Sequence, residues 1–362
     1  MDLWAFARVT AFDPWRSLRG ARVPSIDCGG RPLRRYAQQE HRMEKPAFDF
    51  FETNGIRLRV ALAGQGPLVV LVHGWPESWY SWRHQIPALA AAGYRVAAPD
   101  VRGYGGSDKP QPAEAYAIKE MCADIAGLVT ALGETRAILI GHDWGAPIVW
   151  NTALFHPEKV SAVAGLSVPH TGRGPAPRIE LFRKIYKDRF FYQLYFQTPG
   201  VAEAELEADV RTSLRKIYYW SSGEGMKAGS RVHKPANARL LDGLADPNPF
   251  PGWLTPADLD YYVHEFQQSG FRGPLNRYRT SELDFTQLAM VADQRIKQPA
   301  AFIAGSLDPV LRFVPGVDLI ELMRSRMGDL RLLRLIDGSG HWVQQESPVE
   351  VNTALLQFLT GL

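Results

Sequence analysis

Short runs of apolar residues alternate with helix-like stretches along most of the chain. Six of these runs have the length and composition of buried strands: 68–72, 95–99, 137–140, 160–166, 300–304 and 331–336. Runs that are apolar on both faces are typical of central strands in a parallel sheet covered by helices. Helix-like stretches separate the earlier runs, at 82–92, 118–132 and 147–156. The alternation predicts an α/β fold with a doubly wound, mostly parallel sheet flanked by helices.

Two local signals mark the first and last elements of this predicted domain. The pair Asn54-Gly55 within 48–62 is a strong indication of a β-hairpin with a two-residue turn. Near the C-terminus, a closing helix is expected over 348–359. Ser347 is its predicted N-cap, and the proline that follows suits the first helical position.

The alternation of strands and helices stops between about 169 and 293. This stretch is rich in aromatic residues and helix-like segments, and it contains no run that suits a central strand. We therefore expect a helical cap inserted in the sheet domain. The predicted division is an N-terminal extension at 1–44, an α/β core formed by 45–168 and 294–362, and a cap at 169–293.

Charge and cysteine content exclude several classes of protein. The net charge of +3 comes from residues 1–42, which hold eight arginines and four acidic residues, so the remainder carries −1. That balance gives no indication of nucleic-acid binding. No apolar run is long enough to cross a bilayer. Cys28 and Cys122 lie too far apart in sequence to indicate a disulfide framework or a metal pair, which favours a reducing, cytoplasmic location.

The N-terminal extension at 1–44 lacks sustained periodicity and carries scattered proline, glycine and arginine. We interpret it as a loosely docked arm, or as the result of a start codon assigned upstream of Met43. An organelle transit peptide is the alternative, because such segments are rich in arginine and poor in acidic residues.

The stretch 138–146 carries the strongest chemical signal. An apolar run ends at Gly141, Asp143 follows two positions later, and Gly145 stands two beyond it, before a helix-like stretch. This is the layout of a nucleophile elbow, a tight strand-to-helix turn of the form Gly-x-nucleophile-x-Gly. Asp143 stands where esterases have serine. No Gly-x-Ser-x-Gly occurs in the chain, which argues against a serine esterase.

An elbow needs an acid and a histidine later in the chain. Asp308 comes just after the apolar run at 300–304, and His341 lies on a glycine-rich loop after the last run. Both positions are at the carboxyl ends of predicted strands, where open α/β sheets build their sites. Asp143, Asp308 and His341 therefore form a candidate catalytic triad.

The loop at 73–77 follows the first central run, where this fold supplies one backbone N–H of its oxyanion hole. The two predicted N–H donors are those of Trp75 and of Trp144, the residue after the candidate nucleophile. The Trp75–Pro76 peptide bond in this loop is a candidate for the cis form.

Several motifs carry a resemblance to a known family: His73-Gly-Trp-Pro-Glu77, Asp100-x-Arg-Gly-Tyr-Gly-Gly-Ser-Asp108, Gly141-His-Asp-Trp-Gly145 and Gly340-His-Trp342. From about residue 47 to the C-terminus, the chain resembles the α/β-hydrolase-fold epoxide hydrolases of the soluble type. These core motifs are shared with dehalogenases of the same fold. The segments 192–207 and 269–279 are similar to the cap of the epoxide hydrolases and are more specific, because they place the two tyrosines that an epoxide needs.

The resemblance implies a two-step conversion of an epoxide to a vicinal diol. Asp143 would attack a ring carbon and form a hydroxyalkyl ester, while Tyr192 and Tyr278 donate hydrogen bonds or a proton to the ring oxygen. His341, oriented by Asp308, would then activate the water that hydrolyses the ester. The reaction needs no metal and no organic cofactor.

The expected partners are water and a mostly apolar epoxide, because an aromatic cap predicts an apolar pocket. His73, Pro76 and Trp342 are expected to line that pocket. Tyr195 is an alternative to Tyr192, although the register of the motif favours Tyr192. The oligomeric state stays open, with a homodimer as one option.

Arg277 departs from the family pattern, which commonly has an aromatic residue before the second cap tyrosine. We expect its side chain to point to solvent; the alternative is a cation near the pocket wall that favours an acidic substrate tail. Two other functions share the core motifs. A dehalogenase would use the same nucleophile and base without needing the two tyrosines, and a non-catalytic binding protein would keep only the scaffold.

Overall fold

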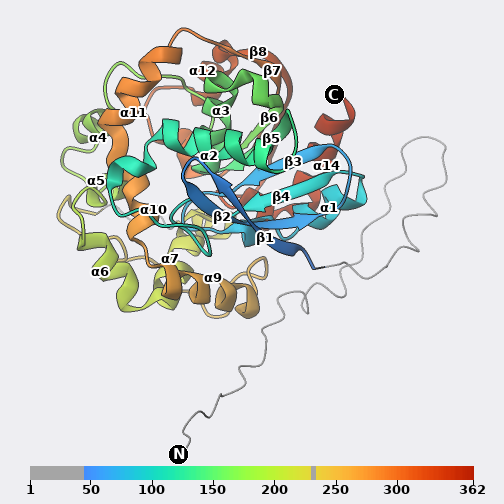
Figure 1. Ribbon diagram of the computed structural model, residues 1–362. Helices are drawn as coiled ribbons and strands as arrows, with labels where there is room; N and C mark the ends of the chain where they lie inside the picture. The colour runs from blue at the N-terminus through green and yellow to red at the C-terminus, as the bar shows by residue number, and fades with distance from the viewer. Residues whose placement is uncertain (1–44, 230–233) are drawn as a thin grey trace, which may run out of the picture.

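An eight-stranded sheet forms the centre of the fold in the computed structural model, which describes residues 45–229 and 234–362 (Figure 1). The strands are β1 (Ala47–Thr53), β2 (Ile56–Ala63), β3 (Leu68–Val72), β4 (Arg95–Pro99), β5 (Ala137–His142), β6 (Val160–Leu166), β7 (Ile296–Gly305) and β8 (Met327–Ile336). Their order is β1-β2-β4-β3-β5-β6-β7-β8. All pairs from β4 to β8 are parallel, and β2 pairs antiparallel with β1 and β4. The predicted mostly parallel sheet is confirmed.

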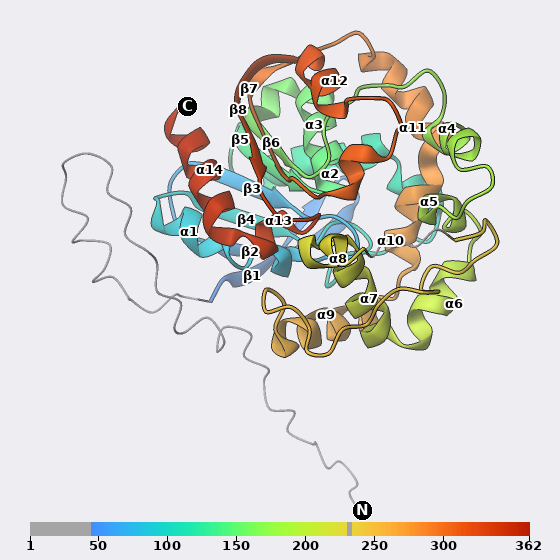
Figure 2. The same ribbon diagram turned by 180° about the vertical axis from the view of Figure 1, so that it is seen from behind.

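Helices cover both faces of the sheet (Figures 1 and 2). The helices α2 (Ile118–Ala131) and α3 (Gly145–Phe155) pack together on one face, and α1 (Gln85–Ala91) and α14 (Pro348–Thr360) pack together on the other. Every residue of β3 and β5 is buried, as expected for strands between two helical layers. The predicted helix at 82–92 is shorter than expected, because a 3₁₀ turn over Trp79–Trp82 precedes α1.

The hairpin of β1 and β2 has the predicted two-residue turn. Thr53 pairs with Ile56, and the two turn residues Asn54 and Gly55 have φ angles of 46° and 73°. Both angles lie in the left-handed region that the favoured hairpin turn requires, and asparagine and glycine tolerate this region best.

The segment between β6 and β7 consists of helices and the loops that join them, and none of its described residues belongs to a strand of the sheet. Its helices are α4 (Arg178–Ile185), α5 (Tyr192–Tyr195), α6 (Val201–Ala208), α7 (Val210–Ser221), α8 (Gly223–Lys227), α9 (Pro256–Ser269), α10 (Arg272–Asn276) and α11 (Ser281–Gln287). Figures 1 and 2 together show α4 to α10 gathered to one side of the sheet. Two shorter elements of the sheet region follow, α12 (Leu319–Arg326) and α13 (Val343–Glu346). The numerical domain boundaries stay a prediction, and the expectations for 1–44 lie outside the described residues.

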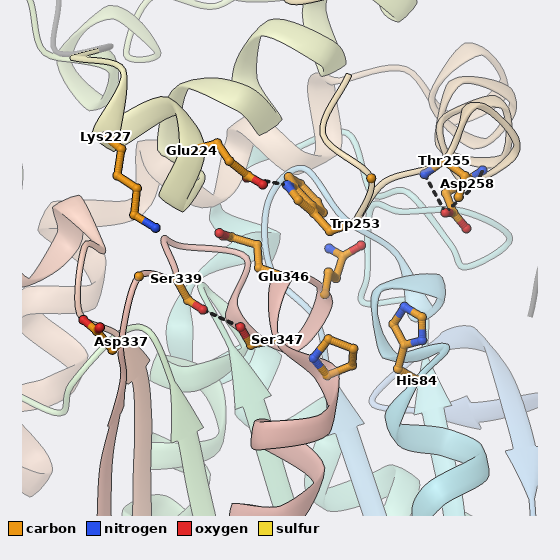
Figure 3. A pocket seen from close by; sticks show the side chains of 14 residues that line it. His84, Glu224, Lys227, Trp253, Thr255, Asp258, Asp337, Ser339, Glu346 and Ser347 are labelled. Carbon is orange, nitrogen blue, oxygen red and sulfur yellow. Dashed lines mark hydrogen bonds between the residues drawn. The ribbon is translucent and has the colours of Figure 1, made fainter. Parts of the chain in front are cut away.

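The closing helix α14 begins at Pro348, as predicted, but its N-cap acts differently. Ser347 occupies the N-cap position without a side-chain bond to the helix. Its hydroxyl instead forms a 2.6 Å hydrogen bond with the hydroxyl of Ser339 (Figure 3). Ser347 therefore joins the helix to the loop that carries His341. None of the helices in the described part is both long and apolar enough to span a membrane.

Candidate active site

Asp143 stands between the end of β5 and the start of α3, at the tip of a tight turn. Its φ angle of 49° lies in the left-handed region, which is strained for a residue with a side chain. The neighbouring glycines make this turn feasible: a Cβ atom on Gly141 would clash with the Gly145 carbonyl group, and one on Gly145 would clash with the Val72 carbonyl group. The local geometry is that of a nucleophile elbow.

The three residues of the predicted triad come together from distant parts of the chain. His341 Nε2 lies 3.2 Å from Asp143 Oδ2, and His341 Nδ1 lies 3.0 Å from Asp308 Oδ2. All three side chains are buried. Asp308 Oδ1 also accepts a 2.9 Å bond from the Val310 N–H, which holds its carboxylate toward the histidine. The arrangement pairs a carboxylate with a histidine that a second carboxylate orients.

Charge and burial act against each other at the triad. Burial alone would lower the pKa of His341, but the charge of Asp308, hydrogen bonds to Asp143 and Asp308, and the charge of Asp143 together raise it well above its usual range. Burial would raise the pKa of Asp143, but His341, His142 and the Trp75 N–H together lower it. Asp143 is therefore ionised at neutral pH, as a nucleophile must be.

The second oxygen of Asp143 contacts the loop after β3. Trp75 N–H donates a 2.7 Å hydrogen bond to Asp143 Oδ1. A Cβ atom on Gly74 would clash with the Asp143 side chain, so only glycine permits this approach. Trp144 is the N-cap of α3, where backbone N–H groups have no intrahelical acceptor. The Trp75–Pro76 peptide bond is cis, as its sequence context suggested.

The two cap tyrosines meet above the elbow. The ring centres of Tyr192, on α5, and Tyr278, in the 3₁₀ turn Arg277–Thr280, are 5.9 Å apart. Both rings also pack against Trp75, at 6.5 and 5.9 Å. Burial and the nearby charge of Asp143 are among the causes that raise the pKa of Tyr192, and burial first among several causes raises that of Tyr278 well above 10.0. Both phenols therefore keep their protons at neutral pH and can donate them.

Tyr195 is held away from this pair. Its hydroxyl group donates a 2.7 Å hydrogen bond to Glu205 Oε2, within the cap. Tyr192, in contrast, accepts a 3.0 Å bond from Gln193 Nε2, which leaves its O–H free to donate. These contacts support the choice of Tyr192 over Tyr195.

The three predicted pocket residues have structural contacts of their own. Both ring nitrogens of His73 lie 2.9 Å from backbone atoms, the Gly74 carbonyl oxygen and the Val101 nitrogen. The Trp342 indole donates to the Tyr218 carbonyl group at 2.8 Å, and the Tyr218 hydroxyl donates to the Pro76 carbonyl group at 2.6 Å. These contacts favour a supporting role for His73 and Trp342 over the predicted contact with substrate.

Sequence reasoning assigned no role to Glu77 and His142, although both lie in the motifs that it singled out. Glu77 Oε2 lies 2.7 Å from His142 Nδ1 and accepts a 3.0 Å bond from the Gly74 N–H. His142 Nε2 lies 2.8 Å from the His341 carbonyl oxygen. This buried chain joins the oxyanion-hole loop, the elbow and the histidine loop. The sequence did offer a signal for this contact: Glu77 ends the motif at 73–77, and His142 lies between Gly141 and Gly145.

Glu346 holds the histidine loop from the other side, beside a separate cavity of about 600 Å³ that the triad does not line (Figure 3). Its carboxylate accepts hydrogen bonds from the backbone N–H groups of Gly340 and Trp342, both at 2.9 Å, and of Gly223 at 2.7 Å. Burial raises the pKa of Glu346 to about 7, although the three N–H donors oppose this shift. The protonation of Glu346 is thus linked to the loop that carries His341.

The prediction that Arg277 points to solvent is wrong. Its side chain is buried, with an exposed fraction of 3% for the residue. The guanidinium group pairs with Asp284 at 2.7 Å and lies over the Trp144 ring, 4.2 Å from the ring centre. The sequence does not reveal this orientation, because it depends on tertiary contacts with Asp284 and the Trp144 ring.

The chain is similar to a known protein family and to several known enzymes. A family model described as the alpha/beta hydrolase fold matches residues 67–348. Epoxide hydrolase A of Mycobacterium tuberculosis is 46% identical over 323 residues, which cover 88% of this chain and 99% of that protein. Bifunctional epoxide hydrolase 2 of Rattus norvegicus is 39% identical over 308 residues, 84% of this chain and 54% of the rat protein.

Solved structures that are similar to this chain are epoxide hydrolases as well. The crystal structure of Epoxide Hydrolase A from Mycobacterium thermoresistibile has a TM-score of 0.82 and 48% identity, covering 88% of this chain and 99% of its own. An epoxide hydrolase from an endophytic Streptomyces has a TM-score of 0.84 and 45% identity, covering 88% and 96%.

Proposed function

The chain belongs to the epoxide hydrolases of the α/β-hydrolase fold, and on this premise we propose that Asp143 is the nucleophile that opens the epoxide ring. One observation carries the proposal: the two oxygens of Asp143 have different partners. Oδ1 accepts the Trp75 N–H, and Oδ2 faces His341 Nε2. Oδ2 is then the attacking atom, and Oδ1 becomes the carbonyl oxygen of the resulting ester.

Ring opening proceeds by displacement at a ring carbon. A bond forms between Asp143 Oδ2 and that carbon while the carbon–oxygen bond of the epoxide breaks. The oxygen leaves as an alkoxide, a strong base that needs a proton as the charge develops. Tyr192 and Tyr278 supply hydrogen bonds, and one of them supplies the proton. Their raised pKa values keep them protonated for this step.

Hydrolysis of the ester uses the other members of the site. Alkylation neutralises Asp143 and so removes one charge and one hydrogen bond that raise the pKa of His341. The lower pKa favours the neutral form of His341, which takes a proton from water while Asp308 steadies its ring. The N–H groups of Trp75 and Trp144 stabilise the tetrahedral oxyanion. The diol leaves with Oδ2, which receives the proton that His341 took from water, and the proton of the restored carboxyl group replaces the one that tyrosine gave.

A single turnover in H₂¹⁸O tests this assignment. Attack by Asp143 predicts that the first diol carries no ¹⁸O and that one label remains in the Asp143 carboxylate. Direct attack of water on the ring would instead label the first diol and leave the protein unlabelled, which would contradict the role of Asp143.

The dehalogenase alternative is not retained, because the relatives that cover most of the chain are named epoxide hydrolases. We keep two finer predictions for the protein in the cell. A cytoplasmic location is testable by cell fractionation, and a homodimer by sedimentation of the purified chain.

A further inference from the structure

Arg178, the first residue of α4, differs from the other interior arginines. Among the described residues, no hydrogen bond or ion pair reaches its guanidinium group, and its Nε atom is buried without a partner. Its contact is with the Trp144 ring, whose centre lies 4.4 Å from the guanidinium carbon. Other arginines with low exposure contact carboxylates: Arg59 with Asp100, Arg83 with Asp258, Arg102 with Asp124, Arg277 with Asp284 and Arg279 with Glu203.

The position of Arg178 relates it directly to the reacting groups. Trp144 follows the nucleophile in sequence, and its ring centre lies 5.2 Å from that of Tyr278. The Trp144 ring centre lies 4.4 Å from the Arg178 guanidinium carbon and 5.2 Å from the Tyr278 ring centre. The guanidinium carbon is therefore within about 10 Å of the Tyr278 ring centre. A substrate whose epoxide oxygen meets Tyr278 can therefore reach Arg178 through a linker of a few bonds.

The local charge is uncompensated. Arg277 also lies over the Trp144 ring, but Asp284 neutralises it. The group of Arg178, Arg277 and Asp284 therefore carries a net charge of +1. Burial first, and then the charge of Arg277, lower the pKa of Arg178 to about 10, so the side chain stays protonated at neutral pH at an energetic cost. A half-buried cation whose Nε atom is buried without a partner is expected to have an anionic partner.

We propose that Arg178 binds a carboxylate on the substrate, so that this enzyme prefers epoxides with a carboxylate a few bonds from the ring. The proposal rests on the proposed function, because it takes the elbow and Tyr278 as the site of ring opening. A single carboxylate matches the net charge of +1, whereas a doubly charged phosphate would leave excess negative charge beside Asp143. The guanidinium fork can also bind a carboxylate through two parallel hydrogen bonds.

The test compares a terminal epoxyhexanoate with the matching epoxyhexanamide, which has the same shape without the charge. The measured quantity is the ratio of kcat/KM for the acid to that for the amide. Arg178→Gln removes the charge and keeps most of the side chain, and Arg178→Lys keeps the charge without the fork. Arg183→Gln is the matched control, because Arg183 lies on the same helix and is exposed.

We expect the wild-type enzyme to prefer the acid. Arg178→Gln lowers the acid-to-amide ratio roughly 10- to 100-fold, the size expected for a charge-assisted hydrogen bond, and Arg183→Gln leaves the ratio at the wild-type value. Arg178→Lys gives an intermediate ratio.

Two results would overturn the proposal. One is a wild-type enzyme with no preference for the acid, which needs no variant to fold. The other is a loss in Arg178→Gln that is equal for acid and amide, as a purely structural contact with Trp144 predicts. If the wild-type enzyme hydrolysed neither compound nor any simple terminal epoxide, the failure would lie with the proposed function instead.

Discussion

Replacing Glu77 with glutamine tests whether the buried acid–histidine contact holds the active site together. Glu77 accepts four hydrogen bonds: two at Oε2, from Gly74 N–H and His142, and two at Oε1, from the side chains of Gln344 and Gln345. Glutamine would place an NH₂ group against one of the two donor pairs, whichever way its amide turns.

The loss of stability in Glu77→Gln can be estimated from these contacts. In Glu77→Gln, two hydrogen bonds are lost and their buried donors are left unpaired, which lowers the free energy of unfolding by about 1–3 kcal/mol for each donor. The total agrees with the loss of about 3–5 kcal/mol expected when a buried ion pair is broken. With an unfolding entropy of about 2.1 cal/mol/K per residue, this loss lowers the Tm by roughly 5–8 °C for a domain of this size.

Differential scanning calorimetry of Glu77→Gln measures the shift. Glu134→Gln is the control, because Glu134 lies 3.6 Å from Arg95 in an exposed pair, and such pairs contribute about 0–1 kcal/mol. A Tm shift for Glu77→Gln no larger than that of the control would show that the Glu77 contacts do not stabilise the fold.

Three further predictions concern the chemistry and the histidine loop. Tyr278→Phe should slow ring opening by about 10²-fold or more in stopped-flow single turnovers, whereas Tyr195→Phe should not, because that hydroxyl is bound to Glu205. Asp308→Asn should slow hydrolysis of the ester by roughly 10³–10⁴-fold while ring opening continues, so rapid-quench experiments should detect accumulating ester. Glu346 has a folded-state pKa of about 7 against an ordinary value of 4.5, so the folded state binds more protons between these pH values. The free energy of unfolding should therefore fall as the pH rises from 4.5 to 7, and Glu346→Gln should reduce that slope in urea titrations. Equal effects of the two tyrosine variants, no ester in Asp308→Asn, or an unchanged slope would contradict the respective predictions.

The triad was predictable because sequence order and strand topology constrain it strongly. Asp143 and His341 lie 198 positions apart, yet each follows an apolar run that forms a strand of the parallel sheet. Parallel strands bring their carboxyl ends to one edge, so the loops after β5, β7 and β8 meet there. The hairpin turn at Asn54 was predictable for a local reason, since few residues accept its backbone angles.

Side-chain contacts between distant segments were not predictable in the same way. The contact of Glu77 with His142 joins two loops that the pattern identified separately, and no periodicity pairs their side chains. Arg277 turns inward because Asp284 and the Trp144 ring compensate its burial, which the polar character of arginine alone does not suggest. Ser347 bonds to a neighbouring loop in place of its own helix for the same reason: tertiary contacts compete with local propensity.

The proposed mechanism requires that a covalent ester form on Asp143 and that His341 be needed only to hydrolyse it. Intact-mass measurement of His341→Gln after mixing with a small epoxide tests this most directly. We predict a gain equal to the mass of the whole epoxide, absent when Asp143 is replaced by asparagine. A His341→Gln protein that turns over the epoxide without ever carrying this added mass, or that carries it equally with Asp143→Asn, would show that no ester forms on Asp143.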